Sequence, residues 1–329
     1  MKKRFALLCI TLLCVSVVSA HTVQTHTFAV RDTQQLAMDI YLPAQPLPQQ
    51  YCIVYMYGGG FMSGARTETE TVTYARKMCS RGYTVAAIDY RLGMKGVTNI
   101  GASTIKIMKN AIDMAVEDCV SAVNFLLAHA DELHISPNRI ILAGSSAGAI
   151  TALHTDYAFA NGSAITASLP DDFRFAGIVA YSGAILSFDG KVKYPNHAPA
   201  PTLFVHGTND HLVKYSQIKV FNIGFFGTQP LAKRFDQLEL PYYARHYVDL
   251  GHEVSMFSAV TTELFESFVT NYIERGRKLR IDEYTKDAAI EPSEASKATT
   301  ADFYNPRKRP IFSKNFQNIY QQLQKMEQY

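Results

Sequence analysis

Five short, continuous apolar runs constrain the fold of this chain more than any other feature of its sequence. Segments with helical periodicity lie between them. A run that is apolar at every position suits a strand covered on both faces. Strands that alternate with helices predict a parallel sheet joined by right-handed crossovers. The sequence therefore predicts an α/β fold, with a mostly parallel central sheet and helices on both faces. The runs are residues 51–57, 83–90, 139–144, 175–182 and 201–207.

Further elements follow from the same patterns. Alternating residues at 25–30 and 36–43 predict an initial pair of strands, and 242–248 predicts a last strand. Residues 93–114 follow a predicted strand where a lid over a pocket would lie, but packing of a helix is the favoured interpretation of their apolar side chains. Helices are expected at 69–82, 115–133, 147–159 and 254–276.

The chain divides into three segments by composition. Residues 1–20 begin with Lys2, Lys3 and Arg4, continue with an apolar run and end in small residues, which is typical of a cleaved signal peptide. Residues 21–276 hold the alternating pattern and form the predicted catalytic domain. Residues 277–329 are a polar C-terminal extension. We therefore expect a secreted or periplasmic protein without a stable membrane span after cleavage.

Charge and cysteine content exclude several classes of function. Removing residues 1–20 takes away three basic residues and no acidic ones, so the formal net charge falls from +3 to zero. A neutral chain has no electrostatic footprint for nucleic acid. Only Cys52, Cys79 and Cys119 remain, which allows at most one disulfide within the chain. The sequence predicts no cofactor and no metal, since His252 lacks a second histidine four residues later.

Residues 144–148, Gly-Ser-Ser-Ala-Gly, match the pattern G-x-S-x-G directly after a predicted strand. A sharp strand-to-helix turn exposes a serine and aims helix N-terminal amides at developing negative charge. The spacing makes Ser146 the candidate nucleophile. A plain Gly/Ser turn explains the small residues equally well, so the choice depends on the rest of the chain.

Acyl transfer also needs donors for an oxyanion. Three consecutive glycines follow the strand at 51–57, and we expect the amides of Gly59 and Gly60 to act together with the amide of Ala147. A glycine-rich loop can instead hold phosphate. That alternative is disfavoured, because neither G-K-[ST] nor G-x-G-x-x-G is present.

A nucleophilic serine needs a base, and the base needs an orienting carboxylate. Asp210 follows the strand at 201–207, and His252 follows the strand at 242–248. The order Ser146, Asp210, His252 is the order that this sheet topology uses. Asp249 is the rival acid, and the weaker candidates for the base are His206, His211 and His246.

With these residues in place, the chain resembles α/β-hydrolases of the carboxylesterase and hormone-sensitive-lipase-like group over residues 24–275. The motifs are YGGGF, AAIDYRL, RIILAGSSAGA, HGTND and GHE, in that order. The resemblance implies a serine-esterase mechanism, and secreted acetyl or feruloyl esterases are a related subgroup. Members usually carry histidine before the glycines, where this chain has Tyr57. The hydroxyl of Tyr57 is expected to hold the glycine loop in place of that histidine.

The sequence thus predicts a secreted serine carboxylic-ester hydrolase that acts on short-acyl or carbohydrate-linked esters. Two alternatives stay open at this point. One is a serine peptidase of the same fold. The other is a catalytically silent binding protein, for which Tyr57 is the best support.

Overall fold

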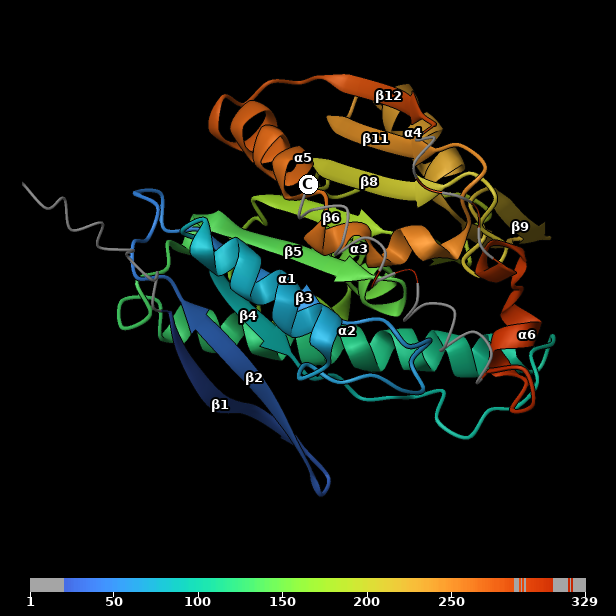
Figure 1. Ribbon diagram of the computed structural model, residues 1–329, viewed down its shortest axis with the longest axis horizontal. Helices are drawn as coiled ribbons and strands as arrows, with labels where there is room; N and C mark the ends of the chain where they lie inside the picture. Colours follow the sequence, from blue (N-terminus) through green and yellow to red (C-terminus); the bar gives the residue numbers. More distant parts are fainter. Residues whose placement is uncertain are drawn as a thin grey trace, which may run out of the picture.

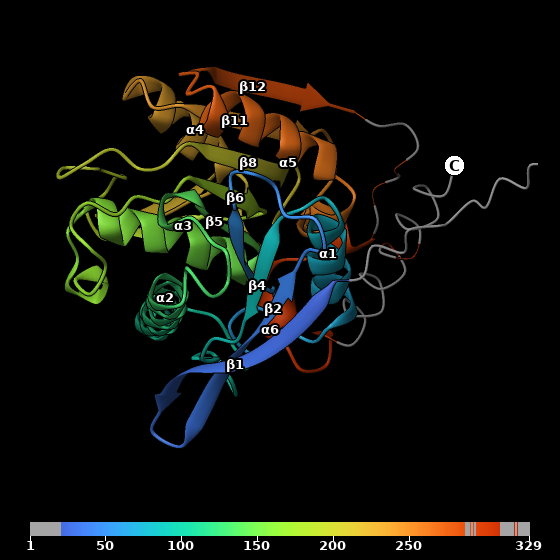
Figure 2. The same ribbon diagram turned by 90° about the vertical axis from the view of Figure 1, so that its left-hand side faces the viewer.

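The computed structural model describes residues 21–286, 290, 292, 294–309, 319 and 321. The predicted signal peptide, residues 1–20, lies outside the described residues. The described chain forms a large mixed sheet covered by helices on both faces (Figures 1 and 2).

The central sheet has nine strands in the order β1-β2-β4-β3-β5-β6-β8-β11-β12. The first two strands pair antiparallel and β2 also runs antiparallel to β4, whereas every later pairing is parallel. This is the mostly parallel arrangement that the apolar runs predict. The strands are β1 (Thr22–Arg31), β2 (Gln34–Leu42), β3 (Cys52–Met56), β4 (Thr84–Ile88), β5 (Ile140–Ser145), β6 (Gly177–Tyr181), β8 (Thr202–Gly207), β11 (Tyr242–Tyr247) and β12 (Arg280–Thr285).

Helices cover the two faces of this sheet unequally. Figure 2 shows α1 and α5 on one face and α2, α3 and α4 on the other. Alternate residues of a strand point to opposite faces, so Ile53 and Tyr55 join the core under α1, and Val54 and Met56 join the core under α3. The helices are α1 (Thr69–Ser80), α2 (Thr104–Ala128), α3 (Ala147–Ala160), α4 (Thr228–Gln237), α5 (Thr262–Phe268) and α6 (Thr300–Tyr304).

Three parts of the fold differ from the elements that periodicity predicts. Helix α2 begins at Thr104, inside the segment considered for a lid. The expected closing helix 254–276 is three pieces: the 3₁₀ helix η3 (His252–Ala259), α5, and the π-helix η4 (Val269–Glu274). A second sheet, β7-β10-β9, was not anticipated and consists of β7 (Ile185–Ser187), β10 (Ile223–Phe226) and β9 (Gln217–Val220).

The C-terminal extension contributes to the central sheet. Strand β12 lies beyond residue 276 and pairs in parallel with β11, as its ninth strand. Its residues alternate between exposed and half-buried, as expected of an edge strand. The expected boundary at residue 276 therefore separates two parts of one sheet.

Cysteines and surface charge are also visible in the structure. Cys52, Cys79 and Cys119 are buried as free thiols.

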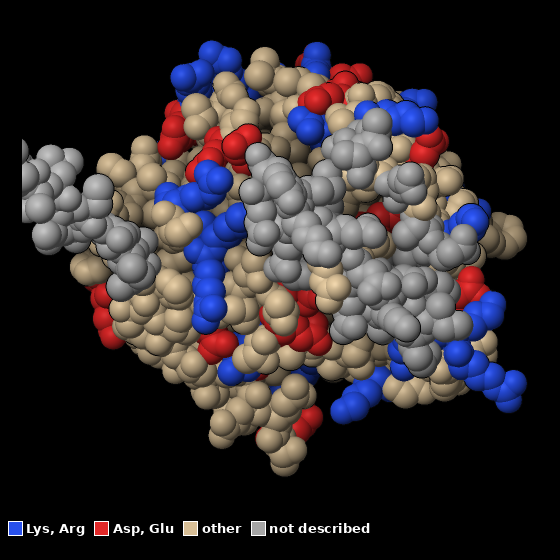
Figure 3. All heavy atoms as spheres, viewed as in Figure 1, with Lys and Arg blue, Asp and Glu red and all other residues tan. Residues whose placement is uncertain are grey.

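On the face drawn in Figure 3, basic and acidic side chains lie among one another. Among the residues that the structure describes, no helix has both the length and the apolar character needed to cross a membrane.

Candidate active site

Ser146 occupies the sharp turn between β5 and α3. Its backbone has φ 52° and ψ −115°, a conformation that strains a residue with a side chain. Two features hold it there. The Ser146 amide donates to the carbonyl of Tyr181 in β6 at 2.8 Å. A Cβ atom at Gly148 would lie 2.0 Å from the Met56 carbonyl oxygen, so only glycine lets α3 approach β3 this closely.

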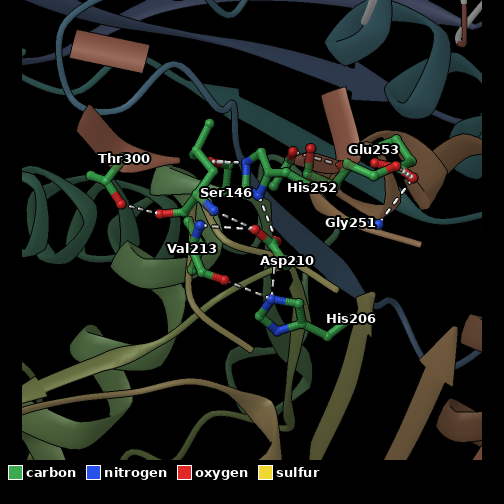
Figure 4. Close-up of polar contacts among 12 residues, drawn as sticks. Ser146, His206, Asp210, Val213, Gly251, His252, Glu253 and Thr300 are labelled. Atoms are coloured by element: carbon green, nitrogen blue, oxygen red, sulfur yellow. Dashed lines mark hydrogen bonds and ion pairs between the residues drawn. The ribbon is translucent and has the colours of Figure 1, made fainter. Parts of the chain in front are cut away.

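The structure brings Ser146, His252 and Asp210 into one hydrogen-bonded chain (Figure 4). The Ser146 Oγ lies 2.8 Å from His252 Nε2, and His252 Nδ1 lies 2.7 Å from Asp210 Oδ2. A carboxylate only accepts, so Nδ1 carries the imidazole proton and Nε2 is left to accept the proton of the serine hydroxyl. The three residues are 6%, 4% and 1% exposed. This arrangement can remove a proton from the serine in a site with little water.

The Asp210 carboxylate is held from both sides. Its Oδ1 accepts the amides of Leu212 and Val213 at 2.9 and 3.0 Å. Its Oδ2 also lies 3.1 Å from His206 Nε2. Burial by itself would raise the pKa of this carboxyl, but the positive potential and hydrogen bonds of His252 and His206 outweigh it and hold the pKa below its usual range. Asp210 therefore stays ionised and can stabilise an imidazolium at His252.

Sequence reasoning missed the role of His206. Its Nε2 contacts both the Asp210 carboxylate and the Val213 carbonyl, two acceptors, so the proton lies on Nε2 and Nδ1 accepts from the Thr228 hydroxyl at 2.9 Å. The available signal was its place in β8, four residues before Asp210. That spacing does not by itself predict contact in a strand followed by a turn.

The glycine loop lies against the candidate nucleophile. A Cβ atom at Gly58 would lie 3.4 Å from the Ser146 Cβ. The Gly59 carbonyl accepts the amides of Met62 and Ser63, both at 3.1 Å, in a tight turn. Ala147 is the first residue of α3, so its amide belongs to the helix end that lacks acceptors within the helix. The start of the loop and the end of the helix thus both lie next to Ser146.

Tyr57, the residue before the glycines, packs as part of an aromatic pair. Its ring stacks on that of Tyr90 with 4.5 Å between the centroids. The Tyr90 hydroxyl donates to the Tyr57 carbonyl at 2.7 Å. Tyr90 therefore braces the first residue of the loop from the end of β4, a role that the sequence analysis did not assign to it.

The remaining candidate residues have partners elsewhere. Asp249 pairs with Lys286 at 2.7 Å, and His211 contacts Lys214 at 3.1 Å. His246 lies between Asp282 at 2.8 Å and a tyrosine hydroxyl. None of these bonds joins the chain of contacts at Ser146.

A cavity of about 270 Å³ lies away from this site, between α2, α3 and β7. His154 lines it and accepts the Leu186 amide on Nε2 at 2.9 Å. Burial disfavours the imidazolium and lowers the pKa of His154 to about 3. The ring is therefore neutral at physiological pH. Its structural role is to accept the hydrogen bond that ties β7 to α3.

The comparison with solved structures identifies the fold. The native esterase 2 of the planctomycete Thermogutta terrifontis superposes with a TM-score of 0.55 at 18% identity, over 75% of this chain and 91% of that one. The predicted fold class is thereby confirmed: the chain has the α/β-hydrolase fold. Residues 38–185 match the BD-FAE family model.

Two relatives found by sequence match this chain over only part of their own length. Gut esterase 1 of Caenorhabditis elegans is 29% identical over 116 residues, which cover 35% of this chain and 19% of that protein. Probable isoprenylcysteine alpha-carbonyl methylesterase ICME of Oryza sativa subsp. japonica is 23% identical over 229 residues, which cover 58% of this chain and 51% of that protein. The chain thus spans about a fifth and about half of the lengths of these relatives.

Proposed function

We propose that this protein is a serine hydrolase that cleaves carboxylic esters through an acyl-enzyme. The observation that carries the proposal is the continuous relay from Ser146 Oγ through His252 to Asp210, with distances of 2.8 and 2.7 Å. A drifted binding protein has no need for an imidazole whose Nε2 faces a strained serine. The relay is the geometry that nucleophilic catalysis by serine requires.

The reaction proceeds in two halves. Ser146 Oγ attacks the ester carbonyl carbon while His252 Nε2 takes its proton, and the carbonyl oxygen becomes an oxyanion held by the amides of Gly59, Gly60 and Ala147. When the carbon–oxygen bond to the alcohol breaks, His252 returns that proton to the alcohol. Water then attacks the acyl group with His252 again as base, the acid leaves, and Ser146 regains its proton.

The substrate class is proposed to be short-acyl or carbohydrate-linked esters. Support for short acyl groups comes from a structural neighbour. Structures of Thermogutta terrifontis esterase 2 have been solved with propionate and with butyrate bound. The residues 1–20 carry the pattern of a signal peptide, so we place the enzyme outside the cytoplasm, as a secreted or periplasmic protein.

Hydrolysis of p-nitrophenyl esters from acetate to octanoate tests the proposal. We expect kcat/KM to fall as the acyl chain lengthens, and all turnover to vanish in Ser146→Ala. The matched control is Ser145→Ala, because the Ser145 hydroxyl instead donates to the Ser255 carbonyl at 2.7 Å. Cleavage of p-nitroanilides at rates comparable to the esters would favour a peptidase. No turnover of any ester or amide would favour the silent binding protein.

A further inference from the structure

The C-terminal extension returns to the candidate active site. We call its residues 294–309 the C-terminal strap. Figure 1 shows α6, in this strap, at the end of the sheet toward which β5 and β8 point. Three side chains of the strap hydrogen-bond beside the three parts of the site: Ser296 Oγ donates to Glu253 Oε1 at 2.5 Å, Thr300 Oγ1 to the Leu212 carbonyl at 2.6 Å, and the Tyr304 hydroxyl to the Gly60 carbonyl at 2.6 Å.

The strap is docked closely rather than lying loosely on the surface. Ser296, Ala298 and Tyr304 are buried. A Cβ atom at Gly251, the residue before His252, would lie 2.4 Å from the Ser296 Cα. The Glu253 carboxylate that receives Ser296 also accepts the Gly251 amide at 2.9 Å, so the strap bears on the turn that carries His252.

The glycine loop is the part of the site that most needs outside support. Gly59 and Gly60 have φ values of +118° and +61°, in the region that residues with side chains avoid. Consecutive glycines have high conformational freedom, so contacts from other parts of the fold must hold their peptide planes. Tyr90 holds the start of the loop at the Tyr57 carbonyl, and the turn at Gly59 holds its middle.

Tyr304 supplies the remaining contact. Its hydroxyl engages the Gly60 carbonyl, and the ring of its neighbour Phe303 lies so close that a Cβ atom at Gly60 would be 2.5 Å from Phe303 Cε1. The hydrogen bond from Tyr304 holds the Gly60 carbonyl and with it the peptide plane between Gly60 and Phe61. Rotation about the backbone bonds of Gly60 is thereby restricted, and these bonds relate the held plane to the Gly60 N–H. A donor aimed at a developing oxyanion is effective only when its direction is set in advance.

We propose that Tyr304 is a positioning residue for the oxyanion hole, and that the strap contributes to the active site through this one side chain. The inference rests on the proposed function, because an oxyanion hole matters only to a hydrolase of this type. It assigns to a tyrosine 244 residues further along the chain part of the bracing of the glycine loop.

The test compares Tyr304→Phe with Thr300→Val in the full chain. Each substitution removes one strap hydroxyl and nearly preserves shape, but only Tyr304→Phe releases the glycine loop. Complete loss of an oxyanion donor costs about 10²- to 10³-fold in kcat. For a donor that is loosened rather than lost, we expect Tyr304→Phe to lower kcat on p-nitrophenyl acetate by about tenfold, with KM unchanged within about twofold. Thr300→Val should lower kcat less than about twofold.

Two further measurements separate positioning from simple docking. A trifluoromethyl ketone adds to the serine and forms an oxyanion, so its affinity for Tyr304→Phe should fall by the same factor as kcat/KM. Hydrogen exchange of the amides of residues 57–64 should accelerate in Tyr304→Phe and not in Thr300→Val. An unchanged kcat, equal losses in both variants, or a loss in KM alone would overturn the inference.

The exchange experiment also separates failure of the proposed function from failure of the role proposed for Tyr304. If the wild-type protein cleaves no ester and binds no ketone, the proposed function fails, and the exchange rates still decide whether Tyr304 holds the loop. If the wild-type protein is active and Tyr304→Phe is kinetically and dynamically unchanged, the inference fails and the proposed function stands.

Discussion

Replacing Asp210 by Asn should disable the relay, although the asparagine side chain has nearly the same size and shape as the aspartate. Asp210 Oδ1 accepts the amides of Leu212 and Val213, so the amide oxygen of the asparagine must take that position. The NH₂ group then faces the two histidines. It forces His252 Nδ1 to accept, which moves the imidazole proton to Nε2, opposite the Ser146 hydroxyl. His252 can then no longer accept the proton of the serine.

The expected loss follows from this tautomer change. A wrong tautomer of the base in such a triad costs on the order of 10⁴-fold in kcat, or about 5.4 kcal/mol of barrier at 1.36 kcal/mol per decade. The NH₂ group also meets the Nε2–H of His206, now 3.1 Å away as donor to donor. We therefore expect a lower unfolding free energy in addition, by about 1–3 kcal/mol.

The assay is the pH profile of kcat for wild type and Asp210→Asn, with circular dichroism to show that the variant folds. A folded Asp210→Asn protein that retains more than about a tenth of wild-type kcat would refute this reasoning, because it would mean that the carboxylate does not set the tautomer of His252.

Three other predictions follow from local contacts. Ser145→Ala should cost about 1 kcal/mol of stability, since it loses one hydrogen bond, and should leave ester turnover within about twofold; a loss as large as that of Ser146→Ala would mean that the wrong serine is assigned. Gly148→Ala should destabilise the fold by about 3 kcal/mol or more in urea unfolding, because its Cβ would meet the Met56 carbonyl at 2.0 Å; an unchanged midpoint would contradict the close packing. Burial raises the pKa of Asp156 to about 7, so the folded protein loses stability as pH rises from about 4 through 7 and the buried carboxyl must ionise. Asp156→Asn should therefore gain up to about 4 kcal/mol at pH 8.5 and almost nothing at pH 4, and an equal effect at both values would show that the carboxyl is not desolvated.

The relay was predictable because each member carries a local signal. Ser146, Asp210 and His252 each follow a buried strand, and the carboxyl ends of parallel strands meet at one edge of the sheet. Apolar runs mark the strands before Ser146 and Asp210, because burial on both faces favours apolar residues there. The strand before His252 was predicted from its place as the last strand of the series. Chain order then assigned the roles of acid and base.

Other elements were out of reach for equally physical reasons. Strand β12 alternates between exposed and half-buried residues, so it lacks the apolar run that marks a central strand. His206 and Tyr90 act through contacts that depend on how strands and turns pack. Tyr304 reaches Gly60 across 244 residues, and no local pattern encodes such a contact.

Labelling with a fluorophosphonate, followed by peptide mapping, tests directly whether Ser146 is the nucleophile. We expect one adduct per chain, located on Ser146, absent from Ser146→Ala and preserved in Ser145→Ala. No adduct on the folded protein, or an adduct on any other serine, would contradict this assignment.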